Sequence, residues 1–276
     1  MKCELEDITV YYELFGDGKP ILMLHGWSSD HRPMVREIEP VFKQRPGWKR
    51  IYLDLPGHDS TPGKEWITNQ DKMLDVVLDF IDHLVPGQRF VVAGISLGAY
   101  LARGIAYHRS EAMDGLLLIV PVIVADNARR HLPPRVTLVA GALSGLQADE
   151  AEVIQNVVVQ TQVVVDTLLA NYAVSKKSGD RAFQATIRDH PERYAFSFDV
   201  DALARPFPAP TLLLMGRQDC GVGYRDAWDI LENYPRGTFV VLDRGGHFLT
   251  LEQRDLFQAL VGEWLDRVEE YAGVLG

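Results

Sequence analysis

Short apolar runs alternate with amphipathic segments along most of this chain, and this alternation limits the possible folds more than any other feature. Apolar runs of about four to eight residues between turn residues are typical of buried strands, and apolar residues three or four positions apart are typical of helices. Strands that alternate with helices form crossover connections in a mostly parallel sheet, so the sequence predicts an α/β fold. The predicted strands are residues 8–14, 21–24, 50–55, 90–95, 115–124, 210–215 and 238–242, and the predicted flanking helices are residues 33–42, 73–84, 97–108, 224–234 and 251–268.

Two segments depart from the regular alternation. The first two strands are joined by little more than a turn at Asp17-Gly18, so we expect this opening pair to be antiparallel to the rest of the sheet. Residues 126–209 contain no convincing buried strand, and we interpret them as a helical cap inserted into a core of residues 1–125 and 210–276. The predicted helices of this insertion are residues 151–159, 162–174 and 181–190.

The charge and composition exclude several classes of partner. The formal net charge is -10, and an acidic surface repels phosphate backbones, so nucleic acid is not expected to bind. No apolar run is long enough to span a bilayer, and the early acidic residues argue against a signal peptide. Cys3 and Cys220 have no metal-ligand spacing, and although their separation leaves pairing open, reduced thiols in a cytoplasmic protein are expected. We expect a monomer or homodimer that acts on a small molecule without metal or organic cofactor.

The segment Gly94-Ile95-Ser96-Leu97-Gly98 matches the G-x-S-x-G pattern of a nucleophile elbow. The pattern alone is common, but here it lies between a predicted strand and a predicted helix, as the elbow requires. A serine at so sharp a turn brings the residues two positions away close to the opposite limb, which explains the two glycines. The alternative is a serine that only caps the helix. We interpret Ser96 as the nucleophile.

A serine hydroxyl needs a base to accept its proton and a carboxylate to orient that base. His247 follows the last predicted strand through the paired glycines Gly245-Gly246, so it can reach the carboxyl edge of the sheet, where ligands of open α/β sheets bind. Any of the eight histidines can instead lie on the surface, and His25 is the main rival. We interpret His247 as the general base.

Asp219 follows the predicted strand at 210–215 and is our candidate for the carboxylate that orients His247. The chain order Ser96, Asp219, His247 agrees with the nucleophile, acid and base order known for this elbow. A loop aspartate can also merely cap the next helix. Asp126, just after the strand at 115–124, is the serious alternative, and Asp226 is a weaker one because it lies inside a predicted helix.

The loop His25-Gly26-Trp27, after the strand at 21–24, is expected to complete the site. The backbone N–H groups of Trp27 and Leu97 are our candidates for the oxyanion hole. His25 is expected to be structural and hydrogen-bonded to nearby backbone. The side chains of Trp27 and Ser28 are candidates for substrate binding, although Trp27 can equally belong to the core.

Taken together, Ser96, Asp219, His247 and the His25-Gly26 loop give a chain that resembles the α/β-hydrolase superfamily, as a serine hydrolase with a helical cap. The segment from Leu55 to His58 is similar to the part of that family that follows its fourth strand, except that Asp59 stands where the family often has glycine. The resemblance implies hydrolytic chemistry. It also argues against epoxide hydrolases and dehalogenases, which have aspartate at the nucleophile position.

We therefore predict a hydrolase of small to medium carboxylic esters that works through an acyl-enzyme on Ser96. One alternative is a carbon–carbon bond hydrolase of the meta-cleavage type. Those relatives usually have a glycine-rich stretch after the His-Gly pair and a tryptophan after the catalytic histidine, whereas this chain has Trp27-Ser28-Ser29 and Phe248. The other alternative is a ligand-binding receptor with vestigial hydrolase activity.

Overall fold

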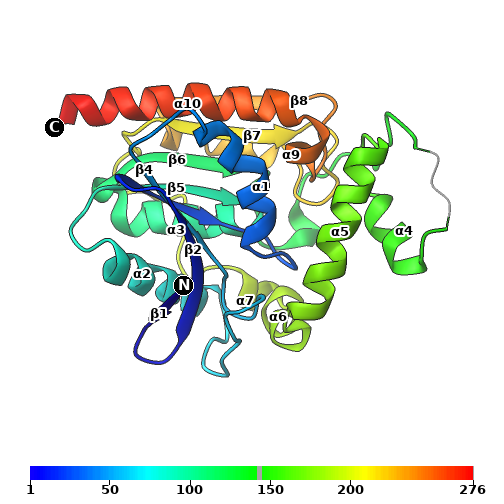
Figure 1. Cartoon of the computed structure of the whole chain (residues 1–276), viewed down its shortest axis with the longest axis horizontal. Helices are drawn as coiled ribbons and strands as arrows, with labels where there is room; N and C mark the ends of the chain where they lie inside the picture. The colour runs from blue at the N-terminus through cyan, green and yellow to red at the C-terminus, as the bar shows by residue number, and fades with distance from the viewer. Residues whose placement is uncertain (142–144, 276) are drawn as a thin grey trace.

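One sheet runs through the computed structural model, which describes residues 1–141 and 145–275 (Figure 1). Within these residues its strand order is β1-β2-β4-β3-β5-β6-β7-β8, and β3 to β8 are mutually parallel. The mostly parallel sheet of an α/β fold is therefore confirmed. The strands are β1 (Lys2–Glu4), β2 (Thr9–Phe15), β3 (Lys19–Leu24), β4 (Trp48–Leu53), β5 (Phe90–Ile95), β6 (Met113–Ile119), β7 (Thr211–Gly216) and β8 (Gly237–Leu242).

The expectation for the opening pair is half wrong. β2 is antiparallel to β4, as expected, but β3 is parallel to both β4 and β5, with Leu24 aligned to Leu53 and Gly94. The reason is geometric: the tight turn between β2 and β3 reverses the chain, so only one of the two can oppose the other strands. β4 lies between β2 and β3 in the sheet. β1 was not predicted, because three residues give no periodic pattern.

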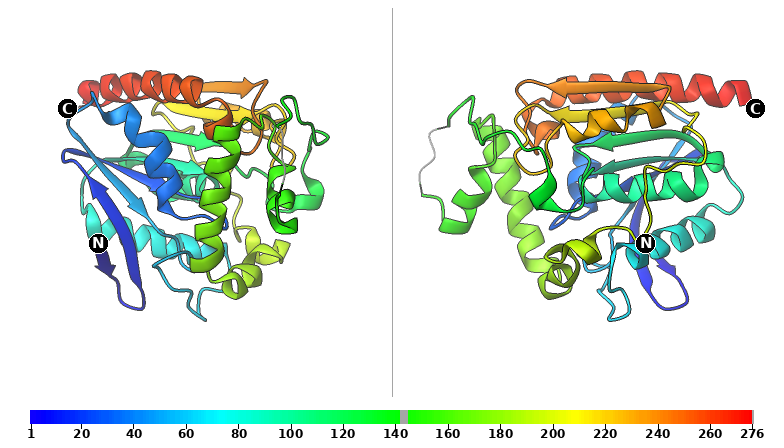
Figure 2. Two further views of the ribbon diagram at one scale, coloured as in Figure 1. Left: turned by 45° about the vertical axis from the view of Figure 1, so that its right-hand side comes forward. Right: turned by 180° about the vertical axis from the view of Figure 1, so that it is seen from behind.

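Helices cover both faces of the sheet (Figures 1 and 2). On one face α1 (His31–Phe42) packs against α10 (Arg254–Leu275), and on the other α2 (Gln70–Leu84) packs against α3 (Leu97–Arg109). Side chains of α1 at helical spacing, Met34, Ile38 and Phe42, are buried. α1, α2 and α3 match the segments predicted as helices from apolar periodicity at 33–42, 73–84 and 97–108.

Outside residues 126–209, three predicted elements differ markedly from the structure. The predicted helix at 224–234 is reduced to α8 (Asp226–Asp229) and a short 3-10 turn at 231–233; Tyr234, which precedes a proline, is not helical. The predicted closing helix is split at Gln253 into α9 (Leu249–Glu252) and α10. The strand predicted at 115–124 ends earlier, since Val120 has a φ of 38°.

The chain between β6 and β7 contains α4 (Ala148–Ile154), α5 (Gln162–Ser178), α6 (Arg181–Arg188) and α7 (Pro191–Tyr194). α4 and α5 lie beyond the end of the sheet where the parallel strands finish (Figure 1). We call residues 126–209 the inserted segment; its described part holds no named strand. Among the predicted helices, 151–159 is shifted to α4, 162–174 extends to Ser178, and 181–190 ends at Arg188. A second apolar cluster joins this segment to α9 through Ile154, Val157, Val164, Val165, Leu168 and Leu251.

No helix in the part of the chain that the structure describes combines the length and apolarity needed to cross a membrane.

Candidate active site

Ser96 lies at the turn between β5 and α3, with φ 55° and ψ -112°. A positive φ is uncommon for a residue with a side chain, and such conformations persist only where the surroundings enforce them. Here the N–H of Ser96 donates to the carbonyl of Ile119 at 2.9 Å, and its carbonyl accepts the N–H of Tyr100 at 3.1 Å. The sheet and the helix thus hold the turn from both sides, and the half-buried serine faces a cavity.

The two glycines of the motif are required by close backbone approach. A Cβ at Gly94 would lie 2.2 Å from the carbonyl oxygen of Gly98, and a Cβ at Gly98 would lie 2.0 Å from that of Leu24. Gly94 thus faces the opposite limb of the turn, as predicted, whereas Gly98 faces the end of β3 and the loop that follows it. A side chain at either position would therefore clash with backbone around the Ser96 turn.

Replacing Gly98 with alanine is expected to destabilise the fold by about 1–3 kcal/mol, the usual cost of overpacking a well-packed site. The new methyl group has to displace backbone, which cannot turn aside as a flexible side chain can. Thermal unfolding measures the effect, and Gly273→Ala on α10 is the control, since nothing lies within 4 Å of a Cβ there. An unchanged midpoint for Gly98→Ala would contradict this packing.

His247 lies in the loop between β8 and α9, and its Nδ1 is 2.9 Å from Oδ2 of Asp219. Asp219 is fully buried after β7, and its other oxygen accepts the N–H groups of Gly221 and Val222 at 2.8 and 3.0 Å. These two bonds fix the carboxylate and leave Oδ2 for the imidazole. Nδ1 then carries the hydrogen, and Nε2 is free to accept a proton.

Ser96 and His247 line the same cavity, with Asp219 behind the imidazole. Within the described residues no hydrogen bond joins Ser96 Oγ to His247 Nε2. Such bonds are often long in an unliganded enzyme and tighten when substrate binds. The structure thus brings the three predicted residues to one edge of the sheet.

Burial by itself lowers the pKa of His247, but the charge and hydrogen bond of Asp219 outweigh it, so the net shift is upward from the ordinary value of 6.5. Arg130 opposes this rise and Glu252 adds to it. The imidazole is therefore protonated to a higher pH than a free histidine.

The pH dependence follows from this shift. A general base must be neutral, so kcat/KM for an ester should fall as the pH drops through the pKa of His247, with a midpoint above 6.5. A pH–rate profile of the free enzyme measures that midpoint. An acidic limb centred below 6.5 would contradict the assignment of Asp219 as the partner of His247.

The loop after β3 passes directly beside the serine. A Cβ at Gly26 would lie 3.2 Å from Cβ of Ser96. Within the described residues, the N–H groups of Trp27 and Leu97 donate to no carbonyl or side chain, so both are free to bind a ligand oxygen. Their place in an oxyanion hole stays a prediction. His25 is fully buried, its Nδ1 lies 2.8 Å from the carbonyl of Gly26, and its Nε2 accepts the N–H of Leu55, as a structural residue should.

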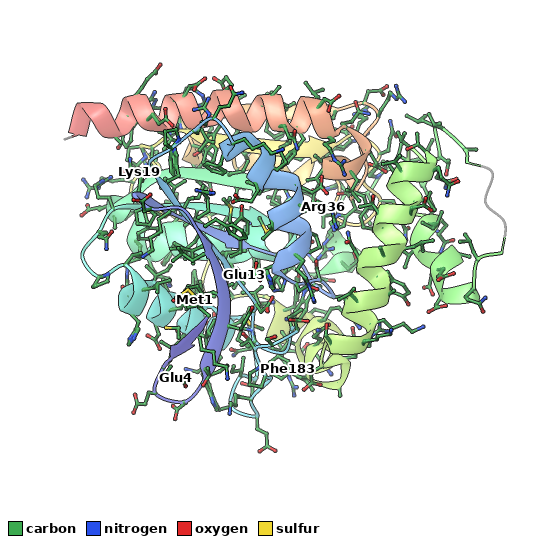
Figure 3. All side chains as sticks on the ribbon, in the orientation of Figure 1. Met1, Glu4, Glu13, Lys19, Arg36 and Phe183 are labelled. Atoms are coloured by element: carbon green, nitrogen blue, oxygen red, sulfur yellow. The ribbon has the colours of Figure 1, made fainter. Side chains whose placement is uncertain are left out.

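The cavity in front of Ser96 has a volume of about 340 Å³ and a mostly apolar wall. Trp27 and Ser28, the predicted substrate-binding residues, line it. Arg36 of α1 also lines it; its side chain extends toward α5 (Figure 3) and donates to Asn171 at 2.9 Å. Thus α1, the inserted segment and the closing helices all contribute to the wall. Besides Trp27, its apolar residues are Pro33, Met34, Ile38, Ile95, Ile119, Val153, Leu168, Phe248, Leu251 and Phe257.

The rival carboxylates have other partners. Asp126 accepts the N–H of Ala128, and Asp226 pairs with His131. Asp59 has a φ of 43° and accepts a hydrogen bond from Arg32 at 2.6 Å. The backbone there thus keeps a left-handed conformation despite the side chain.

Two charged residues near His247 were not predicted from the sequence. Glu252 is buried and accepts the N–H of Gly246 at 2.6 Å. Arg130 donates to the carbonyls of Gly221, Val124 and Ala125 and so ties the Asp219 loop to the segment that follows β6. Neither lies in a recognisable motif, and each also binds a backbone group far away in the sequence, Val158 for Glu252 and Gly221 for Arg130.

Comparison with known proteins places this architecture among hydrolases. A model of the alpha/beta hydrolase family matches residues 21–260. The pimeloyl-[acyl-carrier protein] methyl ester esterase of Legionella pneumophila (strain Corby) is 23% identical over 268 residues, which cover 94% of this chain and 100% of that protein. The 2-hydroxy-6-oxo-6-(2'-aminophenyl)hexa-2,4-dienoic acid hydrolase of Metapseudomonas resinovorans is 21% identical over 275 residues, which cover 94% and 88%. The crystal structure of an alpha/beta superfamily hydrolase from Oenococcus oeni PSU-1 superposes with a TM-score of 0.86 at 26% identity, covering 98% of this chain and 99% of that one.

Proposed function

Because this chain belongs to the alpha/beta hydrolase family, we propose that it hydrolyses small to medium carboxylic esters through Ser96, His247 and Asp219. One observation carries the proposal: a serine in an enforced turn and a histidine paired with a buried aspartate face the same apolar cavity. The Legionella relative is a methyl ester esterase by name, which supports ester chemistry on this framework.

The reaction follows from the roles that the geometry permits. Ser96 Oγ attacks the ester carbonyl while His247 Nε2 takes its proton, and the oxyanion is bound by the N–H groups of Trp27 and Leu97. His247 then returns the proton to the leaving alcohol, which gives an acyl-enzyme. Water activated by the same imidazole releases the acid and restores Ser96. Asp219 stabilises the imidazolium at each proton transfer.

The apolar wall implies a preference for an apolar acyl or alcohol group. Each methylene that enters such a wall contributes about 0.8 kcal/mol, or roughly fourfold in kcat/KM if it is fully buried in the transition state. In a series of nitrophenyl esters, kcat/KM should therefore rise with acyl length and then fall once the chain exceeds the cavity. A flat profile would contradict binding in this cavity.

A carbon–carbon bond hydrolase is the second candidate, favoured by the full-length similarity to the Metapseudomonas enzyme. The two candidate functions differ in the bond that is cleaved and share the same fold. Assaying a vinylogous diketone acid beside the ester series separates the two: ester turnover with no diketone cleavage supports the proposal, and the reverse result overturns it.

A further inference from the structure

A buried carboxylate that the proposed reaction does not use lies beside the histidine loop. Glu252, at the end of α9, is 6% exposed. Its Oε2 accepts the N–H of Gly246, the residue before His247, at 2.6 Å, and its Oε1 accepts the N–H of Val158 at 2.6 Å. Val158 belongs to the inserted segment. One carboxylate thus joins the loop that carries the base to the segment that covers the site.

Apolar packing reinforces the same junction. Ile154 and Val157 of the inserted segment share a buried cluster with Leu251, and Phe248 packs against it. A Cβ at Gly246 would lie 2.7 Å from Cγ2 of Val158, so glycine is needed for the loop to come this close. The inserted segment therefore rests directly on the backbone that positions His247.

The contacts of Glu252 fit an ionised carboxylate. Each oxygen accepts an N–H, whereas a protonated carboxyl would direct its O–H toward a donor. Burial raises the pKa of Glu252; the N–H groups of Gly246 and Val158 oppose that rise by stabilising the charged form, and the net shift is upward. The charge also acts on His247, together with the negative charge of Asp219 and the positive charge of Arg130.

We propose that Glu252 is a positioning residue that holds the His247 loop against the inserted segment, so that the imidazole and the apolar wall of the cavity are placed together. This inference rests on the function proposed above. Glu252 touches neither substrate nor the reacting atoms; it acts through the backbone of Gly246 and Val158.

The test compares Glu252→Gln and Glu252→Asp with Glu270→Gln, an exposed glutamate of α10. The glutamine keeps one acceptor but turns an N–H₂ group toward the second amide, so one of the two bonds is lost. Rates are expressed per site titrated by a fluorophosphonate, which removes unfolded molecules from the comparison. We expect Glu252→Gln to lower kcat/KM about tenfold or more, as small misplacements of a catalytic group do, and Glu270→Gln to match the wild type.

The pH profile adds a readout that a merely structural role would not move. Loss of the negative charge in Glu252→Gln lowers the pKa of His247, so the acidic limb of kcat/KM should shift to lower pH. Glu252→Asp keeps the charge and alters the reach, so it should lower kcat/KM with a smaller shift of the limb. If Glu252→Gln does not fold, the rate and pH profile of Glu252→Asp still test the proposal.

Wild-type rates per titrated site in both variants, with unmoved acidic limbs, would overturn the proposal. Failure of the proposed function looks different, because the wild type itself would then neither label nor turn over esters. Hydrogen exchange still tests the junction in that case: the amides of Gly246 and Val158 should exchange faster in Glu252→Gln. Unchanged exchange at both amides would refute the junction independently of activity.

Discussion

Replacing Ser96 with alanine is expected to lower kcat for a short acyl ester by about 10⁴-fold to 10⁶-fold, the loss seen when the nucleophile of a serine hydrolase is removed. The variant lacks the hydroxyl that forms the acyl-enzyme, while the cavity and the free N–H groups remain. Alanine also retains the turn, since the backbone bonds to Ile119 and Tyr100 do not involve the side chain. Steady-state hydrolysis with the folded variant measures the loss.

Ser110→Ala, at the other end of α3, is the matched control and should retain wild-type rates. A Ser96→Ala protein that still hydrolyses esters within about tenfold of the wild type would exclude the nucleophilic role, because alanine has no hydroxyl that could form the acyl-enzyme. The ester would then be cleaved elsewhere on the protein.

Replacing Asp219 with asparagine is expected to lower kcat by about 10⁴-fold, the effect of this change in a serine protease triad. The asparagine oxygen can continue to accept the N–H groups of Gly221 and Val222. Its N–H₂ group then faces His247 Nδ1 and favours the tautomer with hydrogen on Nε2, which cannot take the proton of Ser96. The upward shift in the pKa of His247 is lost as well.

The chain supplies a matched control in a second histidine–aspartate pair. Asp226 accepts a hydrogen bond from His131, outside the cavity. Asp226→Asn should therefore leave kcat and the acidic limb of the pH profile unchanged. If both variants lost activity equally, the effect would reflect general destabilisation rather than orientation of His247.

The sheet and the candidate site were largely predictable because their signals are local. The apolar strand before Gly94, the glycine pair before His247 and the loop after residue 24 each identify a strand end without long-range information. Parallel strands finish at one edge, so side chains that follow them converge there. The same reasoning separates Asp219 from Asp126 only weakly; the hydrogen bond from His247 to Asp219 distinguishes them in the structure.

What was missed depends on contacts between distant parts of the chain. The direction of β3 depends on the insertion of β4 between β2 and β3, which no local pattern records. The helix predicted at 224–234 is much shorter in the structure, and the proline after Tyr234 explains only where it must end. Glu252 reads in the sequence as an ordinary polar residue of an amphipathic helix, and only the approach of Val158 and Gly246 shows that it is buried and paired.

The arrangement also explains why the inserted segment matters to the proposed chemistry. It supplies part of the apolar wall through Val153 and Leu168, and it meets the histidine loop at Glu252. Changes in that segment should therefore affect both which ester fits and how fast it reacts. Glu252, which contacts this segment from α9, is the most informative residue outside the three that we assign to the reaction.

The central claim is that Ser96 is the nucleophile, and covalent labelling tests it most directly. Folded wild-type protein incubated with a fluorophosphonate should gain one probe mass, and peptide mapping should place the probe on Ser96, while Ser96→Ala remains unlabelled under the same conditions. A wild-type protein that stays unlabelled beside a reactive control hydrolase, or a probe found on another residue, would contradict the claim.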